Sequence, residues 1–233
     1  MGFIRRGKGK LRLSYLPSNS IYFGVLLTLI GGFLDAYAFV TRGGVFANVQ
    51  TGNFVLFGVD LIEGKGYEAF RHIPPILAFV LGVLTAEMLK HQKELRVIGL
   101  SGRIIILAEM LLFTLIGLIP SDVSDVAIAV TVILSFAASL QYSYFRRISN
   151  FVYSNTMITG DLFTATKSIY HSVKKQDKEA TAQFKHFMII IAAFVAGVLI
   201  GAYLIQLFGS RAIWFVSILL LMMAVVYRSS SQV

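Results

Sequence analysis

Two short polar motifs interrupt otherwise apolar sequence. Thr51-Gly52-Asn53 and Thr159-Gly160-Asp161 each combine a hydroxyl group, a glycine and an amide or carboxylate. Threonine, asparagine and aspartate are common first residues of helices, and glycine lets the backbone bend or come close to a solute. We therefore expect a short helix to begin at each triplet. Its free N–H groups and positive dipole end would then favour a polar or anionic solute.

Further polar residues precede the two triplets and could line the same site. Helix capping alone does not account for these residues on the approach side of each triplet. The candidate solute-binding residues are Asn48, Gln50, Thr51, Gly52, Asn53, Gln141, Asn155, Thr159, Gly160 and Asp161. The alternative is that these side chains only cap and pack a broken helix.

Two acidic residues inside apolar stretches are candidates for ion coupling. A charged side chain is costly in lipid and usually faces a cavity or a partner. Asp35 could bind a proton or a cation, or it could instead cap the chain or pair with Arg42. Glu109 could carry a proton, or it could form a pair with Arg103 or Lys90.

The composition indicates that lipid surrounds most of the chain. Of the 233 residues, 56% are apolar and only 14% are charged, and there is no cysteine. The apolar blocks are too long for the helices of a soluble core, which excludes a disordered chain, a disulfide-built module and a nucleic-acid-binding domain. The blocks expected to cross the membrane are residues 21–41, 75–89, 104–119, 126–145, 187–208 and 212–227.

The positions of the basic residues predict the topology. If the two triplet segments do not cross the membrane, seventeen of the 21 Lys and Arg residues lie on one side, which should be the cytoplasmic side. Both termini are then cytoplasmic, and the basic tail 1–20 is expected to contact anionic membrane lipid. The longest loop, residues 166–185, should form an amphipathic cytoplasmic helix. Asp35 favours a retained first helix over a cleaved signal peptide.

The chain contains an internal repeat. Residues 78–84 match residues 193–199 at six of seven positions. Three further matches keep the same order along the chain: Thr51-Gly52 with Thr159-Gly160, Leu34-Asp35 with Leu140-Gln141, and Arg103 with Arg211. Each unit therefore contains a helix, a Thr-Gly segment and two more helices.

Three spans per unit turn the second unit upside down relative to the first. The expected fold is all-α, with six transmembrane helices arranged as two inverted three-helix repeats in a single membrane domain. The repeats are residues 21–119 and 126–227. Each would carry a broken or re-entrant Thr-Gly segment, and the two segments should meet near the middle of the bilayer.

Three segments of the chain resemble the YoaK (DUF1275) family of bacterial membrane proteins: Gly31-Gly32-Phe33-Leu34-Asp35-Ala36, Phe46-Ala47-Asn48-Val49-Gln50-Thr51-Gly52-Asn53 and Thr159-Gly160-Asp161. The resemblance covers the chain from about residue 20 to residue 227. It implies a multi-pass protein of the bacterial cytoplasmic (inner) membrane, and it carries over no catalytic or substrate residue.

Other motifs are interpreted as structural. Gly197 and Gly201 form a small-residue face, which predicts close helix packing within the protomer or at a homodimer interface. The histidines have no metal-ligand spacing, so no metal or cofactor is expected. They are His72, His91, His171 and His186.

The favoured function is a transporter or channel for a small polar or anionic solute, with its site between the two Thr-Gly segments. The alternative is a membrane scaffold or lipid-interacting protein that transports nothing. An intramembrane enzyme would need a carboxylate pair such as Asp35 and Asp161, so no enzymatic activity is expected.

Overall fold

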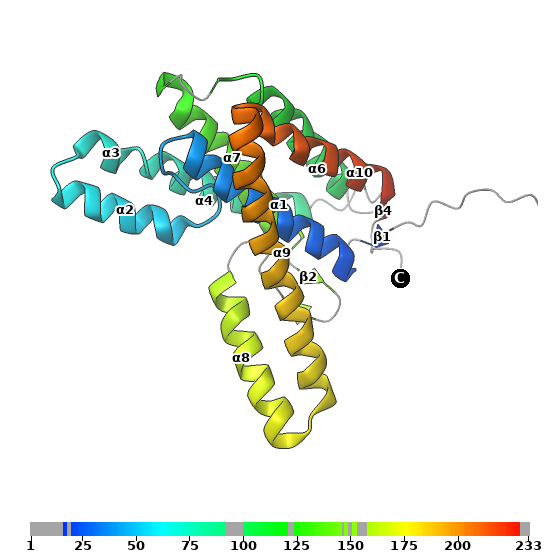
Figure 1. Ribbon diagram of the computed structural model, residues 1–233. Helices are drawn as coiled ribbons and strands as arrows, with labels where there is room; N and C mark the ends of the chain where they lie inside the picture. The colour runs from blue at the N-terminus through cyan, green and yellow to red at the C-terminus, as the bar shows by residue number, and fades with distance from the viewer. Residues whose placement is uncertain are drawn as a thin grey trace, which may run out of the picture.

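Helices form nearly all of the regular structure. The computed structural model describes residues 16–17, 20–91, 100–120, 124–145, 147–148, 151–152 and 158–228 (Figure 1). Its α-helices are α1 (Ile21–Thr41), α2 (Gln50–Ile62), α3 (Gly66–Phe70), α4 (Ile73–His91), α6 (Leu100–Ile116), α7 (Ser124–Tyr144), α8 (Ile158–Lys175), α9 (Lys178–Phe208) and α10 (Trp214–Val226). A 3₁₀ helix, η1 (Gly209–Ile213), joins α9 to α10.

Four very short strands complete the described structure. β1 (Leu16–Pro17) pairs in parallel with β4 (Tyr227–Arg228), which brings the two ends of the described chain together. β2 (Arg147–Ile148) pairs antiparallel with β3 (Phe151–Val152). These strands are accessories to the predicted all-α fold.

Four stretches are long and apolar enough to cross a membrane. They are Ile21–Thr41, Gly66–His91, Val126–Tyr144 and the 49-residue stretch Lys178–Val226, which contains both α9 and α10. At 17 residues, α6 is shorter than the ~20 residues of an average span. A membrane-spanning helical protein is therefore confirmed, whereas six spans stay a prediction.

The outer faces of these helices are apolar, as expected for a surface in contact with lipid. Large exposed hydrophobic side chains follow one face of α4 and one face of α10. They include Leu77, Leu81, Leu84 and Met88 on α4, and Ile218, Leu221, Met222 and Val225 on α10. Apolar surface this continuous is unusual for a soluble monomer.

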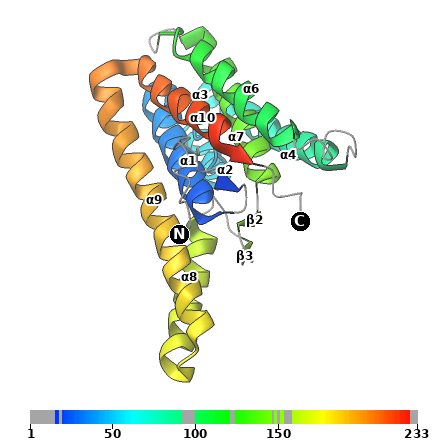
Figure 2. The ribbon, with the colours of Figure 1, turned by 90° about the vertical axis from the view of Figure 1, so that its right-hand side faces the viewer.

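The loop predicted as one amphipathic helix is a helical hairpin. α8 ends at Lys175, and Gln176 adopts a left-handed conformation with φ of 52°. Asp177 then caps α9, because its side chain accepts hydrogen bonds from the N–H groups of Glu179 and Ala180. α8 packs along the first half of α9, and this hairpin projects from the rest of the bundle (Figure 2).

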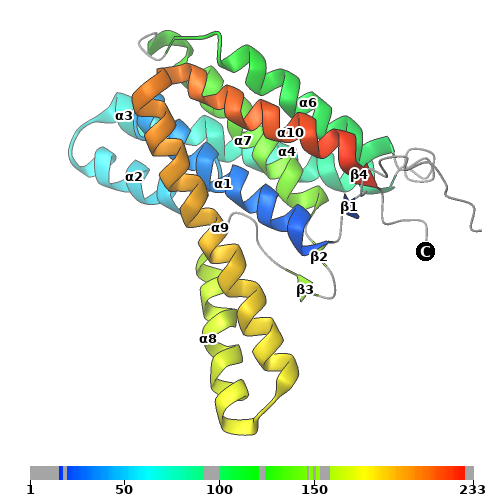
Figure 3. The ribbon, with the colours of Figure 1, turned by 45° about the vertical axis from the view of Figure 1, so that its right-hand side comes forward.

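Three helix pairs build the bundle. α1 packs against α9, α4 packs against α7, and α6 packs against α10. In Figure 3, α1, α6 and α10 run in the same direction, while α9 crosses them at a steeper angle. Because α6 and α10 lie side by side over α1 and α7, the buried core gathers between these four helices.

Glycines allow the closest helix approaches. A Cβ atom at Gly32 would clash with the carbonyl oxygen of Phe194, and one at Gly197 would clash with that of Leu29. These contacts bring α1 and α9 together backbone to backbone. A Cβ atom at Gly82 would similarly clash with the Phe136 carbonyl oxygen, where α4 meets α7. The small-residue face of α9 is therefore buried within the protomer.

Candidate functional site

The first triplet lies where the chain returns to helix after an irregular segment. α1 ends at Thr41, the chain runs without regular structure through residues 43–49, and α2 begins at Gln50. Thr51 is exposed, Gly52 is half-buried and Asn53 is fully buried in the first turn. The expected short helix therefore begins at this triplet.

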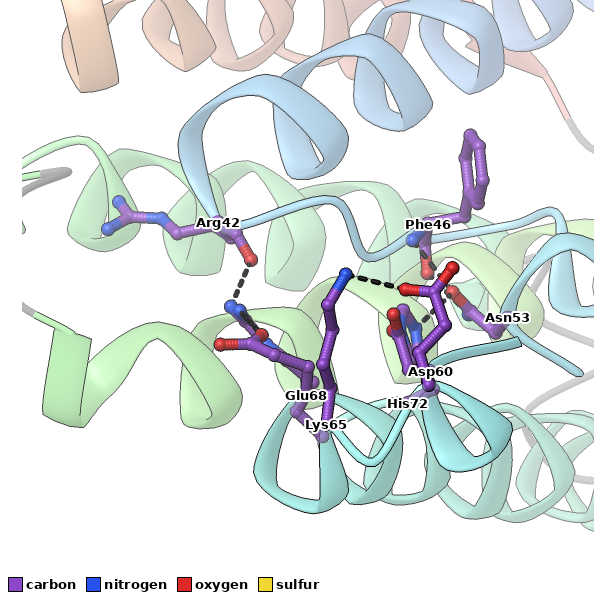
Figure 4. Close-up of polar contacts among 9 residues, drawn as sticks. Arg42, Phe46, Asn53, Asp60, Lys65, Glu68 and His72 are labelled. Carbon is purple, nitrogen blue, oxygen red and sulfur yellow. Dashed lines mark hydrogen bonds and ion pairs between the residues drawn. The ribbon is translucent and has the colours of Figure 1, made fainter. Parts of the chain in front are cut away.

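Asn53 clamps the irregular segment onto the start of α2. Its Oδ1 accepts a hydrogen bond from the N–H of Phe46 at 2.9 Å, and its Nδ2 donates to the Phe46 carbonyl oxygen at 2.9 Å. The same Nδ2 donates to Oε1 of Gln50 at 2.8 Å, and Nε2 of Gln50 donates to the Ala47 carbonyl oxygen at 2.9 Å. Both side chains thus hold the backbone of the approach segment in place (Figure 4).

Asp35 reaches the same segment from the buried side of α1. Its Oδ1 accepts a hydrogen bond from the Asn48 N–H at 2.8 Å, and Nδ2 of Asn48 donates to the Gly31 carbonyl oxygen at 3.1 Å. Asp35 is only 4% exposed. Two buried oxygens, Oδ2 of Asp35 and Oδ1 of Asn48, have no hydrogen-bond partner within the described ranges.

Arg42 does not neutralise Asp35. Its guanidinium group donates to the carbonyl oxygens of Pro120 at 2.8 Å and Ile119 at 2.9 Å, and to the Tyr37 hydroxyl at 3.3 Å. These carbonyls follow the end of α6, where the negative end of the helix dipole favours a cation. Arg42 therefore joins α1 to the segment after α6, and the pair with Asp35 that the sequence left open does not form.

A second polar chain supports α2 from the other side. The Nε2 atom of His72 lies 3.4 Å from Oδ2 of Asp60, and its Nδ1 lies 3.4 Å from Oδ1 of Asn53. The imidazole is almost completely buried. Among the residues that the structure describes, no three His, Asp or Glu side chains group as a metal site would require. Sequence reasoning missed His72, because no local motif links it to the triplet.

The neighbouring surface contains an exposed ion-pair network. Arg71 contacts Glu68 at 2.6 Å and donates from its other terminal nitrogen to the Arg42 carbonyl oxygen at 2.9 Å. That second hydrogen bond links α3 and α4 to the C-terminus of α1 (Figure 4). Lys65 contacts Glu63 at 2.6 Å in the turn after α2, and this hydrogen bond raises the pKa of Lys65.

The second triplet has the same burial pattern as the first. Thr159 and Gly160 are exposed, and Asp161 is buried in the first turn of α8. Asn155 lies outside the described residues, so its predicted role stays a prediction. α8 packs on α9, whereas α2 packs on α3 and α4. The meeting of the two triplets in one site also stays a prediction.

The two remaining predicted residues lie in the interior of other helices. Gln141 of α7 is buried, and its Oε1 has no hydrogen-bond partner in the described part of the chain. Glu109 of α6 is 1% exposed, and neither carboxyl oxygen has a partner there. Arg103 donates instead to the Tyr227 carbonyl oxygen at 2.9 Å, and Lys90 pairs with Glu87 at 2.6 Å.

A comparison with known families covers almost the whole chain. The model of DUF1275, described as a protein of unknown function, matches residues 23–226. The chain belongs to the DUF1275 family. The resemblance found in the sequence is thereby confirmed. No curated protein and no solved structure matches the chain.

The chemistry of this DUF1275 site follows from its unpaired acceptors. The anion expected at the start of α2 is the protein's own Asp35, since its carboxylate already receives the Asn48 N–H. The remaining buried atoms, Oδ2 of Asp35 and Oδ1 of Asn48, are both acceptors. Such a pair favours a cation or a polar molecule that donates hydrogen bonds over a further anion.

Proposed function

We propose that this protein is a transporter or channel for a small polar solute, with its site between the two Thr-Gly segments. The observation that carries the proposal is the exchange of helix partners between the two halves. α1 packs on α9 as α7 packs on α4, and α6 packs on α10. Inverted repeats that share a two-fold axis in the membrane plane produce this exchange, and many transporters are built this way.

The glycine contacts support the same symmetry. Gly82 and Gly197 occupy matching positions in the two repeated stretches 78–84 and 193–199. Each lies against a carbonyl oxygen of the first helix of the other half, Phe136 and Leu29 respectively. Two equivalent backbone contacts are what an inverted repeat predicts, whereas an accidental bundle has no reason to repeat them.

The triplets supply the irregular backbone that a solute site in a membrane needs. Each begins a helix, α2 or α8, and in each the third residue, Asn53 or Asp161, is buried while the threonine is exposed. Non-helical backbone at membrane depth survives where protein or a water-filled cavity satisfies its polar groups. Near the first triplet, the free acceptors of Asp35 and Asn48 favour a solute that carries hydrogen-bond donors.

The proposal extends to location and assembly. We place the protein in the bacterial cytoplasmic membrane with both termini in the cytoplasm, and we propose that it moves its solute without chemical conversion. A homodimer through the Gly197 and Gly201 face also stays a proposal. Because both glycines lie against α1 within the protomer, such a dimer would use the exposed side chains beside them, including Val195 and Leu199.

Flux through reconstituted protein tests the proposal. The full chain in vesicles should move at least one member of a panel of amino acids, nucleobases, sugars and small ions. Asp35→Asn should abolish that flux and the thermal stabilisation by the same solute, whereas Glu63→Gln, on the exposed turn after α2, should change neither. Absence of flux for every solute would overturn transport. Stabilisation by anionic lipid alone would then favour the scaffold alternative.

A further inference from the structure

A second buried acid lies in the core of the bundle, separate from the triplets. Glu109 is in the middle of α6, and both of its oxygens lack a hydrogen-bond partner among the described residues. A buried carboxylate without a counter-charge is unstable in a low-dielectric interior. The basic residues nearest in sequence-based expectation, Arg103 and Lys90, bind elsewhere. The compensating charge must therefore come from solution.

Three buried hydroxyl groups share this property. Thr28 of α1, Ser135 of α7 and Ser217 of α10 each have a buried oxygen without a partner in the described ranges. Hydroxyls in helices usually donate to a carbonyl oxygen one turn earlier, as Thr131 does to Ile128 and Ser139 does to Phe136. The three exceptions leave their lone pairs and protons available to another group.

An aromatic cluster shows how the four helices align. The rings of Phe23, Phe145 and Tyr227 meet at centroid distances of 5.2, 5.9 and 6.2 Å, which joins the start of α1 to the ends of α7 and α10. Gly102 at the start of α6 lies directly against the ring of Tyr227. All four helices therefore have one end at this cluster.

Counting along each helix from that cluster brings the four polar groups to similar depths. At 1.5 Å per residue, Thr28 lies about 8 Å from the cluster and Glu109 about 10 Å, while Ser135 and Ser217 both lie about 15 Å from it. The spread is little more than one helical turn. All four side chains are buried in the core that these helices enclose.

We propose that Glu109, Thr28, Ser135 and Ser217 form a binding site for one monovalent cation, either Na⁺ or H⁺. The carboxylate supplies the neutralising charge. The three hydroxyls supply further oxygen ligands for Na⁺, or acceptors for the proton when Glu109 holds it. Such a site would serve as a coupling site for the proposed transport, on which that part of the inference rests. The binding itself can be measured without any transport.

Thermal unfolding of the purified full-length protein tests the binding. In buffer free of alkali ions at about pH 8, Na⁺ should raise the unfolding temperature by about 5 °C when its concentration is about 100 times Kd. Choline at equal ionic strength should not. Glu109→Gln should abolish the Na⁺ effect, whereas Glu87→Gln, an exposed acid paired with Lys90, should retain it.

The proton version has its own result. Without Na⁺, the unfolding temperature of the wild type should fall as pH rises, and Glu109→Gln should remove that part of the fall. Ser135→Ala and Ser217→Ala should weaken the response to the bound ion at least tenfold in concentration, whereas Ser139→Ala, whose hydroxyl already donates to Phe136, should not.

Two outcomes would overturn the inference. In one, neither Na⁺ nor pH changes the difference between wild type and Glu109→Gln. In the other, the response persists in Glu109→Gln. A protein that responds to the cation yet moves no solute would overturn the transport proposal and leave the cation site intact.

Discussion

Asp35 and Asn48 join the first membrane helix to the irregular segment that precedes the first triplet. The Asn48 N–H donates to Oδ1 of Asp35 at 2.8 Å, thirteen residues away in sequence. The Asn48 side chain returns the contact by donating to the Gly31 carbonyl oxygen one turn below Asp35. This exchange places a carboxylate at the start of α2 and leaves one oxygen of each side chain free for a ligand.

Asp35→Ala should destabilise the protein. The substitution leaves the buried N–H of Asn48 without an acceptor, which costs about 1–3 kcal/mol of unfolding free energy. Asp35→Asn keeps an oxygen at the same position and should lose much less. Unfolding in mixed detergent micelles measures both variants. Equal stabilities for the alanine variant and the wild type would contradict the role of this hydrogen bond.

Asn53→Ala should loosen the segment before α2. It removes the two hydrogen bonds to Phe46 and the one to Gln50, a loss of about 2–4 kcal/mol. Backbone hydrogen exchange in residues 43–49 should accelerate more than elsewhere. Thr51→Ala, in the same helical turn but exposed, is the matched control and should leave exchange unchanged. Uniform exchange rates in both variants would show that the clamp is unimportant.

Gly82→Ala and Gly197→Ala should both destabilise the bundle. In each case the new methyl group meets a backbone carbonyl of the neighbouring helix, and overpacking of this kind costs about 1–3 kcal/mol. Gly58→Ala in α2 has open space around the new methyl group and should be neutral or slightly stabilising, because alanine favours helix. Thermal unfolding of the three variants compares them. A harmless Gly197→Ala would argue against the tight contact between α1 and α9.

Cysteine labelling in intact cells tests the predicted topology. The natural chain has no cysteine, so a single introduced thiol reports without background. Glu63→Cys, after α2, should react with a membrane-impermeant reagent from outside, and Lys178→Cys, in the α8–α9 hairpin, should react only after the cells are opened. Both positions are exposed. Labelling of both from the same side would rule out the inverted arrangement.

The helices were more predictable than the contacts between them. The first predicted span, residues 21–41, coincides with α1, because a long apolar run between Ser20 and Arg42 is a local property of the chain. The start of α9 was misplaced at residue 187, whereas it begins at Lys178. The polar residues before 187 conceal a helix that Asp177 caps and α8 covers, and apolar periodicity does not register such a segment.

The sequence by itself determined the membrane setting, the family, the internal repeat and the start of a helix at each triplet. All of these follow from residue type and spacing along the chain. Tertiary structure alone decided the partners: Arg42 binds carbonyls after α6, Asp35 binds Asn48, and Glu109 is left with three hydroxyl groups at similar depth. Partnership between side chains depends on how helices align across the bundle, and residues distant in sequence meet only when the chain has folded.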